Sequence, residues 1–337
     1  MTKRERFLNF LANKPVDRVP VAFFHHFCDH SEWLKGLKSE AIFEKNIDGH
    51  RKSRAVFDPD VIKIMNDSLM IMTVDTSFVE KASDLRKIQP IDMNSPFVQK
   101  TKELTLRSKA FYEGSDAPIY CTGFSPVMVL RTSLGGLALA GGKHILVEYL
   151  EEDPESVMAG LDIIAESIMK LNEMLVKECG MEGIYFSVNN QSHVIPDELY
   201  RKYITPSDMK VMDHANTLSD INLLHICGYA GRANNLELFK DYHAAAFNWA
   251  VHAEGVSLAE GKKLFGGKPV FGGFEQATVI YKGSREEVEQ FTWKILDEAG
   301  DIGIMIGADC TVPTDIDDNR LEWVRQACVE YARRKQA

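Results

Sequence analysis

Short apolar runs recur along the chain, and most are followed by a longer stretch with helical patterning. Continuous apolar runs of this length are typical of strands buried on both faces of a parallel sheet. Amphipathic stretches such as residues 154–179 and 284–299 separate them, with helix starts expected at Asp153-Pro154 and Gly283-Ser284. Eight runs are present: 19–27, 61–66, 118–124, 183–188, 222–228, 245–251, 269–274 and 304–310.

Eight strands alternating with helices favour an α/β fold of the (β/α)₈ barrel type over a doubly wound sheet. A doubly wound fold usually has a glycine-rich phosphate loop, and neither G-x-x-x-x-G-K-[ST] nor a G-x-G-x-x-G after a strand is present. We see no internal repeat and no linker. The sequence therefore predicts one barrel domain over residues 1–337, with a short N-terminal helical extension that places Phe7, Leu8, Phe10 and Leu11 on one side.

Charge and composition restrict the class of partner. The net charge is −10, with 39 Lys plus Arg against 49 Asp plus Glu, which argues against a nucleic-acid partner. No apolar stretch of about 18 residues predicts a membrane span, and the charged N-terminus does not resemble a signal peptide. We therefore expect a cytoplasmic protein. Six cysteines without a C-x-x-C pair are expected to be core residues or ligands rather than disulfides.

The stretch "LLHICG" places His225 and Cys227 two residues apart, just before Gly228. Side chains alternate across a strand, so these two project from the same face. In a barrel that face is the interior, and active sites assemble at the C-terminal ends of the strands. We therefore expect both side chains at the mouth of the barrel.

Cys310 ends the last apolar run and supplies a candidate third ligand. One histidine and two cysteines leave a tetrahedral zinc ion with an open position, which is typical of catalytic zinc sites. Thiolate and imidazole ligands also favour zinc over magnesium or calcium. The sequence predicts a zinc site formed by His225, Cys227 and Cys310. The alternative is that the cysteines are small buried hydrophobic residues and the histidine is a core residue.

Four stretches carry a family resemblance: "HICG", "GADCTVPTD", "MTKRERFLNFLANKPVDRVPV" and "FNWAVHAEGVSLAEGKKLFGGKPVFGGFEQ". Together they are similar to the uroporphyrinogen decarboxylase superfamily, whose members are (β/α)₈ barrels. The similarity extends over nearly the whole chain. Within the superfamily, H-x-C plus a distant cysteine resembles the zinc-dependent corrinoid methyltransferases, such as methylcobamide:coenzyme M methyltransferases. His225, Cys227 and Cys310 match that pattern.

The resemblance implies a function with a metal cofactor and a protein partner. It implies zinc-dependent methyl transfer between a corrinoid (cobalamin) carried by a partner protein and a thiol or methylated small molecule. The sequence does not decide the direction of transfer. It also implies a homodimer, because superfamily members are often dimers.

Two other functions stay open. The first is a metal-free decarboxylase of a tetrapyrrole or other carboxylate, with Asp67 catalytic because "KIMNDSLM" is similar to the family's "FSDIL" segment. Decarboxylases carry an arginine-rich "RQAGRY" segment to bind propionates, however, and this chain has no arginine between Arg18 and Arg51. The second is a barrel that binds a corrinoid or tetrapyrrole without turnover.

Further polar residues follow predicted strands. Glu275 is a candidate pocket acid or exchangeable fourth zinc ligand, and Asp67 either acts in the pocket or caps its loop. The histidine-rich segment at 25–30 is expected to line the pocket rather than bind metal. The candidate substrate-binding residues are His26, Asn189, Asn190 and Gln191, the last three being alternatively loop formers.

Overall fold

Strands and helices alternate along the chain in this computed structural model, as the apolar runs predict. The structure describes residues 1–135, 144–192, 194–228 and 231–336. Within those ranges, seven strands form one parallel sheet in which each strand pairs with the next in sequence order. They are β1 (Ile62–Ile64), β2 (Ile119–Phe124), β3 (Gly183–Val188), β4 (Leu223–Ile226), β5 (Ala246–Trp249), β6 (Val270–Phe274) and β7 (Ile304–Ala308).

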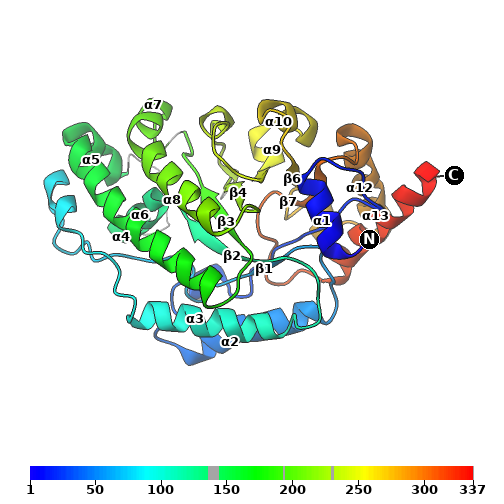
Figure 1. The fold of residues 1–337 in the computed structure, drawn as a ribbon, viewed down its shortest axis with the longest axis horizontal. Helices are drawn as coiled ribbons and strands as arrows, with labels where there is room; N and C mark the ends of the chain where they lie inside the picture. The colour runs from blue at the N-terminus through cyan, green and yellow to red at the C-terminus, as the bar shows by residue number, and fades with distance from the viewer. Residues whose placement is uncertain (136–143, 193, 229–230, 337) are drawn as a thin grey trace.

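Helices lie around the outside of the curved sheet (Figure 1). None in the described ranges is long and apolar enough to cross a membrane. That residues 1–337 form a single domain stays a prediction. The helices are α1 (Lys3–Leu11), α2 (Glu40–Arg54), α3 (Pro96–Ala110), α4 (Pro126–Gly135), α5 (Ile145–Glu152), α6 (Pro154–Lys177), α7 (Asp197–Leu199), α8 (Thr205–Leu218), α9 (Val251–Glu254), α10 (Leu258–Leu264), α11 (Val279–Lys282), α12 (Arg285–Ala299) and α13 (Asn319–Gln336).

Two helix starts predicted from the sequence are confirmed by their caps. The Asp153 side chain accepts a hydrogen bond from the Ser156 backbone N–H (3.1 Å) at the start of α6. Ser284 and Glu287 form a reciprocal capping box at the start of α12. Both caps pair N–H groups that have no partner within their own helix.

The first apolar run, 19–27, was expected to be a strand and is not one. It makes two isolated parallel bridges, Val21 with Ile306 and His25 with Val312. On the β1 side, the Val21 N–H donates to the carboxylate of Asp60 (2.8 Å) rather than to a strand carbonyl. A side chain thus replaces part of the backbone ladder, so the run pairs without becoming a regular strand.

Helix α1 packs against aromatic side chains on the inner face of the curved sheet. Phe7 and Phe10 are fully buried, and the Phe7 ring meets Tyr120 of β2 edge-on at 6.0 Å between centroids. The prediction that Leu8 shares this face is wrong, because Leu8 is 44% exposed. Successive helical residues are about 100° apart, so Leu8 points well away from both phenylalanines.

Candidate active site

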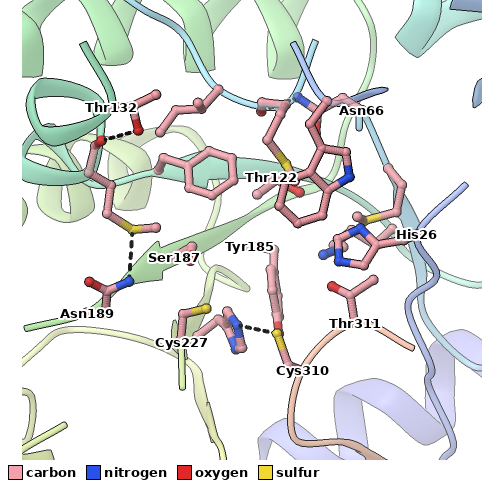
Figure 2. A pocket seen from close by; sticks show the side chains of 18 of the residues that line it. His26, Asn66, Thr122, Thr132, Tyr185, Ser187, Asn189, Cys227, Cys310 and Thr311 are labelled. Atoms are coloured by element: carbon pink, nitrogen blue, oxygen red, sulfur yellow. Dashed lines mark hydrogen bonds between the residues drawn. The ribbon is translucent and has the colours of Figure 1, made fainter. Parts of the chain in front are cut away.

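A cavity opens at the C-terminal ends of β1 to β4 and at the loop after β7 (Figure 2). Its empty space is about 890 Å³, including open solvent at its mouth. Alternation along the strands sends pairs of residues two positions apart into it, such as Tyr185 with Ser187 and His225 with Cys227. The remaining lining residues include the apolar side chains Met65, Met70, Ile71, Phe124 and Met128.

Three side chains of types that serve as metal ligands meet in the wall of this cavity. One ligand atom each from His225, Cys227 and Cys310 lies within 4.8 Å of the other two, and Cys310 Sγ is 3.8 Å from His225 Nε2. The first two come from β4 and the residue after it, and Cys310 comes from the loop after β7. The structure thus brings together the three residues that the sequence singled out.

Asp309 fixes the loop that carries Cys310. Its N–H donates to the Phe274 carbonyl (2.7 Å), and its carboxylate accepts from the N–H groups of His252 (2.9 Å) and Gly273 (3.4 Å). Burial raises the pKa of Asp309 to about 6, although the hydrogen bond from the His252 N–H opposes the shift. These contacts tie the end of β7 to β6 and hold Cys310 at the cavity.

Asn248 of β5 determines which nitrogen of His225 faces the cysteines. The Asn248 amide nitrogen donates to the carbonyls of Phe271 (2.8 Å) and Ala308 (3.3 Å), which leaves its oxygen to contact His225 Nδ1. The same oxygen accepts from the Tyr185 hydroxyl (3.0 Å). An acceptor at Nδ1 keeps the proton there and leaves Nε2 with the lone pair that a metal ligand needs.

The thiol of Cys310 lies in surroundings that favour its ionised form. A hydrogen bond with Cys227 lowers the pKa of Cys310 well below its ordinary value, and His225 adds to the effect while burial opposes it. Thiolate is the form that binds metals and attacks electrophiles. The site therefore combines a thiol that ionises readily with an imidazole nitrogen, two of the ligand types that zinc prefers.

His26 lines the cavity, and Asp67 contacts one of its ring nitrogens. His26 Nδ1 is 2.9 Å from Asp67 Oδ1, and the other carboxylate oxygen accepts from the N–H groups of Phe27 and Cys28. Asp67 is fully buried and does not line the cavity, because these backbone groups turn its carboxylate away. A direct catalytic role for Asp67 stays a prediction, and its contacts are those of a positioning residue.

The three polar residues after β3 divide into two groups. Asn189 and Gln191 line the cavity, whereas Asn190 does not. The Asn190 amide nitrogen donates to Asp197 (2.8 Å) and Ser192 (3.1 Å), and its oxygen accepts from the Asn235 N–H (3.0 Å). These contacts match the second role that the sequence left open for Asn190, which is to form the loop rather than to bind substrate.

Glu275 lies after β6, as predicted, but outside the cavity wall. Its carboxylate accepts a hydrogen bond from the N–H of Ala277 (3.1 Å) two residues on. That hydrogen bond engages the carboxylate within its own loop. The proposed roles of Glu275, as pocket acid or fourth zinc ligand, stay predictions with no contact here to support them.

Sequence reasoning missed several polar residues of the site, among them Lys63, Arg131 and Asn248. Lys63 and Arg131 line the cavity, and Asn248 supports His225. Each is the first polar residue to interrupt an apolar stretch, "VIKIMN", "PVMVLRT" and "AAFNWAV". That isolation was the available signal, because a buried polar side chain must find a partner.

Comparisons with known proteins agree with this architecture. The family model described as "Uroporphyrinogen decarboxylase (URO-D)" matches residues 71–331. A methyltransferase from Methanosarcina mazei is similar with a TM-score of 0.70 at 16% identity, over 98% of this chain and 99% of that one. A B12-independent methionine synthase from Shewanella sp. W3-18-1 is similar with a TM-score of 0.61 at 14% identity, over 95% and 99%. No curated protein matches the chain. At such identities the structural likeness shows the fold.

Proposed function

The chain belongs to the uroporphyrinogen decarboxylase family, and from that premise we propose that it is a zinc-dependent methyltransferase. It would move a methyl group between the corrinoid of a partner protein and a thiol or methylated small molecule. The observation that carries this proposal is the meeting of His225, Cys227 and Cys310 in the wall of an open cavity. We also propose that residues 19–26 take the place of an eighth strand and complete a barrel.

The three residues fit zinc in donor type and in spacing. Tetrahedral zinc with ordinary bond lengths separates a cysteine sulfur from a histidine nitrogen by about 3.6 Å. Cys310 Sγ and His225 Nε2 are 3.8 Å apart, and the side of this cluster facing the cavity leaves room for a further ligand. Bound zinc would lower the pKa of a coordinated thiol and favour its thiolate near neutral pH.

The protein's own residues would bind the substrate and take its proton. With Nδ1 directed at Asp67, His26 has Nε2 left for the cavity, where it accepts the proton that a thiol substrate loses. Asp67 fixes the ring for that transfer. The apolar side chains in the wall exclude water from the developing thiolate.

Metal-free decarboxylation is less well supported by the site. That alternative needs Asp67 in the cavity, but its carboxylate is turned to backbone N–H groups instead. It also needs several arginines to bind carboxylates, and Arg131 is the one arginine in the wall among the described residues. Methyl transfer, in contrast, uses the three residues that do converge.

Metal analysis and a transfer assay test the proposal together. Purified protein is expected to hold about one zinc per chain, as metal affinities of Cys/His sites predict. Metal-loaded protein is expected to methylate at least one thiol in a panel with methylcobalamin as donor, and treatment with a chelator is expected to abolish this until zinc is restored. Zinc without any thiol methylation would favour the demethylating direction, and protein that never retains zinc would contradict the proposal.

Replacing Asn248 by leucine is expected to weaken zinc binding about 10- to 100-fold, the usual effect of removing the group that orients a metal-binding histidine. Leucine has a similar volume but cannot accept the proton of His225 Nδ1. Competition with a chromophoric chelator measures the affinity. Asn216→Leu is the matched control, because Asn216 contacts the His243 carbonyl and the Asn222 side chain, away from the cavity. Equal affinity in the two variants would contradict the role of Asn248.

A further inference from the structure

A second cavity lies beside the active-site cavity and is lined by the ends of β1 and β2 and by the helices α3 and α6. The space open to water within this side cavity is about 30 Å³. One bound water needs about 10–15 Å³, so the side cavity has room for a molecule of about two to four non-hydrogen atoms. Five residues line both cavities: Asn66, Met70, Ile71, Thr122 and Phe124.

Four polar atoms in the wall of the side cavity have no hydrogen-bond partner within the described ranges. They are Asn172 Nδ2, Thr101 Oγ1, Thr122 Oγ1 and Asn66 Oδ1. Asn172 and Thr101 are the most deeply buried of the four residues, at 1% and 4% exposed. Asn172 lies on the buried stripe of α6, four residues after Ile168, where an apolar side chain would be expected. Because an unpaired buried polar group is costly, four such atoms in one wall indicate a ligand that pairs with them.

The polar groups of the wall determine the charge and the hydrogen bonding of such a ligand. In the part of the chain that the structure describes, no Asp, Glu, Lys, Arg or His lines the side cavity. An ion bound there would be buried without a counter-charge, so the wall favours an uncharged ligand. The Asn172 amide nitrogen can only donate and the Asn66 oxygen can only accept, whereas threonine hydroxyls do either. A ligand that pairs with all of them must both accept and donate hydrogen bonds.

Most of the remaining wall is apolar. A bound water needs about two to four polar partners, and apolar side chains supply none. An alkyl group, in contrast, gains from contact with them. The apolar part of the wall therefore favours a ligand with a short alkyl group over water alone. It includes Met72, Phe97, Val129, Ile168, Leu171 and Leu175.

We infer that the side cavity binds a small uncharged molecule that has a hydroxyl or primary amide group and a short alkyl part. The polar group pairs with Asn172 and Thr101, and the alkyl part packs against the apolar wall. In Figure 2, Asn66 and Thr122 lie above the two labelled cysteines, so the wall shared by the two cavities lies away from the proposed metal site. The inference depends neither on zinc nor on methyl transfer.

Methionine-methyl NMR of the full chain tests the inference, because the methionines divide between the two cavities. Met72 lines only the side cavity of the two, whereas Met65 and Met128 line only the active-site cavity. Ethanol and acetamide are each expected to shift the Met72 signal saturably and to leave the signals of Met65 and Met128 unchanged. Acetate and ethylammonium, which match them in size but carry charge, are expected to leave Met72 unchanged. The tighter of the two neutral probes identifies the preferred polar group.

Two substitutions in the wall test which side chains hold the probe. Asn172→Leu keeps a similar volume but removes the amide, and Thr101→Val removes the hydroxyl. Each is expected to weaken binding of the neutral probes about 2- to 10-fold, the usual effect of losing one hydrogen bond. Asn216→Leu in α8 is the matched control, because Asn216 lies outside both cavities. The inference is wrong if neither neutral probe shifts Met72, if the charged probes shift it equally, or if both wall variants bind as tightly as the control.

Discussion

Cys310→Ala protein is expected to retain less than about one-tenth of a zinc per chain, against about one in the unaltered protein. Cys310 lies on the loop after β7, whereas His225 and Cys227 lie together at the end of β4, so its removal leaves ligands from one strand only. Methyl transfer is expected to fall by more than the 10- to 100-fold that follows loss of a supporting residue. Metal analysis after gel filtration and the methylcobalamin assay measure the two effects.

Cys328→Ala is the matched control for this experiment. Cys328 is a buried cysteine, 1% exposed, but it lies in α13 and outside the cavity. Its replacement therefore measures the ordinary effect of deleting a buried thiol, without touching the cluster. Zinc retained by Cys310→Ala, or lost equally from Cys328→Ala, would show that the three residues are packing rather than a metal site.

The meeting of His225, Cys227 and Cys310 was predictable because strand alternation is a local rule. His225 and Cys227 must share a face wherever "LLHICG" is extended, and parallel strands place their C-terminal ends on one side of the sheet. Cys310 could then be expected nearby from its position after the last run. Helix starts such as Asp153 and Ser284 were predictable for the same reason, since a cap depends on residues within one turn.

Features that depend on distant partners were not predictable in this way. The run 19–27 has the composition of a strand, but its Val21 N–H is taken by the Asp60 side chain, 39 residues away. Asp67 was expected in the pocket because it follows β1, yet the backbone of Phe27 and Cys28 turns it away. Lys63 and Arg131 lie in apolar runs. The hydrophobic pattern of such a run predicts a strand or helix, but it does not predict that a polar side chain within it lines a cavity.

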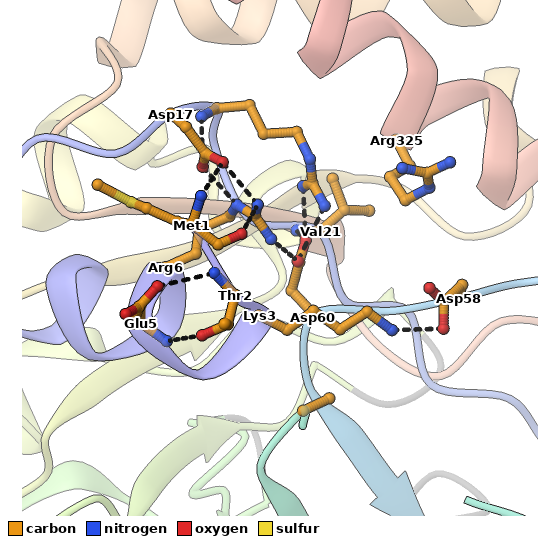
Figure 3. Close-up of polar contacts among 12 residues, drawn as sticks. Met1, Thr2, Lys3, Glu5, Arg6, Asp17, Val21, Asp58, Asp60 and Arg325 are labelled. Carbon is orange, nitrogen blue, oxygen red and sulfur yellow. Dashed lines mark hydrogen bonds and ion pairs between the residues drawn. The ribbon is translucent and has the colours of Figure 1, made fainter. Parts of the chain in front are cut away.

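The Asp60 carboxylate holds the segment before His26 through a buried ion-pair cluster (Figure 3). It accepts from Arg6 Nη1 (2.6 Å), from Arg18 Nη1 (2.6 Å) and Nη2 (2.9 Å), and from the Val21 N–H (2.8 Å). Asp60 is fully buried, and both guanidiniums are at most 9% exposed. Arg6 also pairs with Asp17 (2.7 Å), whereas Arg18 has no second carboxylate among the described residues.

Asp60→Asn is expected to lower the free energy of unfolding by about 3–5 kcal/mol, the usual cost of leaving a buried charge without its partner. Urea unfolding followed by circular dichroism measures it. Asp58→Asn is the matched control, because Asp58 is about half exposed and its pairs with Lys3 and Arg54 are worth about 1 kcal/mol or less. Adding Arg18→Met to Asp60→Asn is expected to recover part of the loss, since it removes the stranded cation. Equal destabilisation by the two asparagine variants, or no recovery in the double variant, would show that charge pairing at Asp60 does not hold this segment against the sheet.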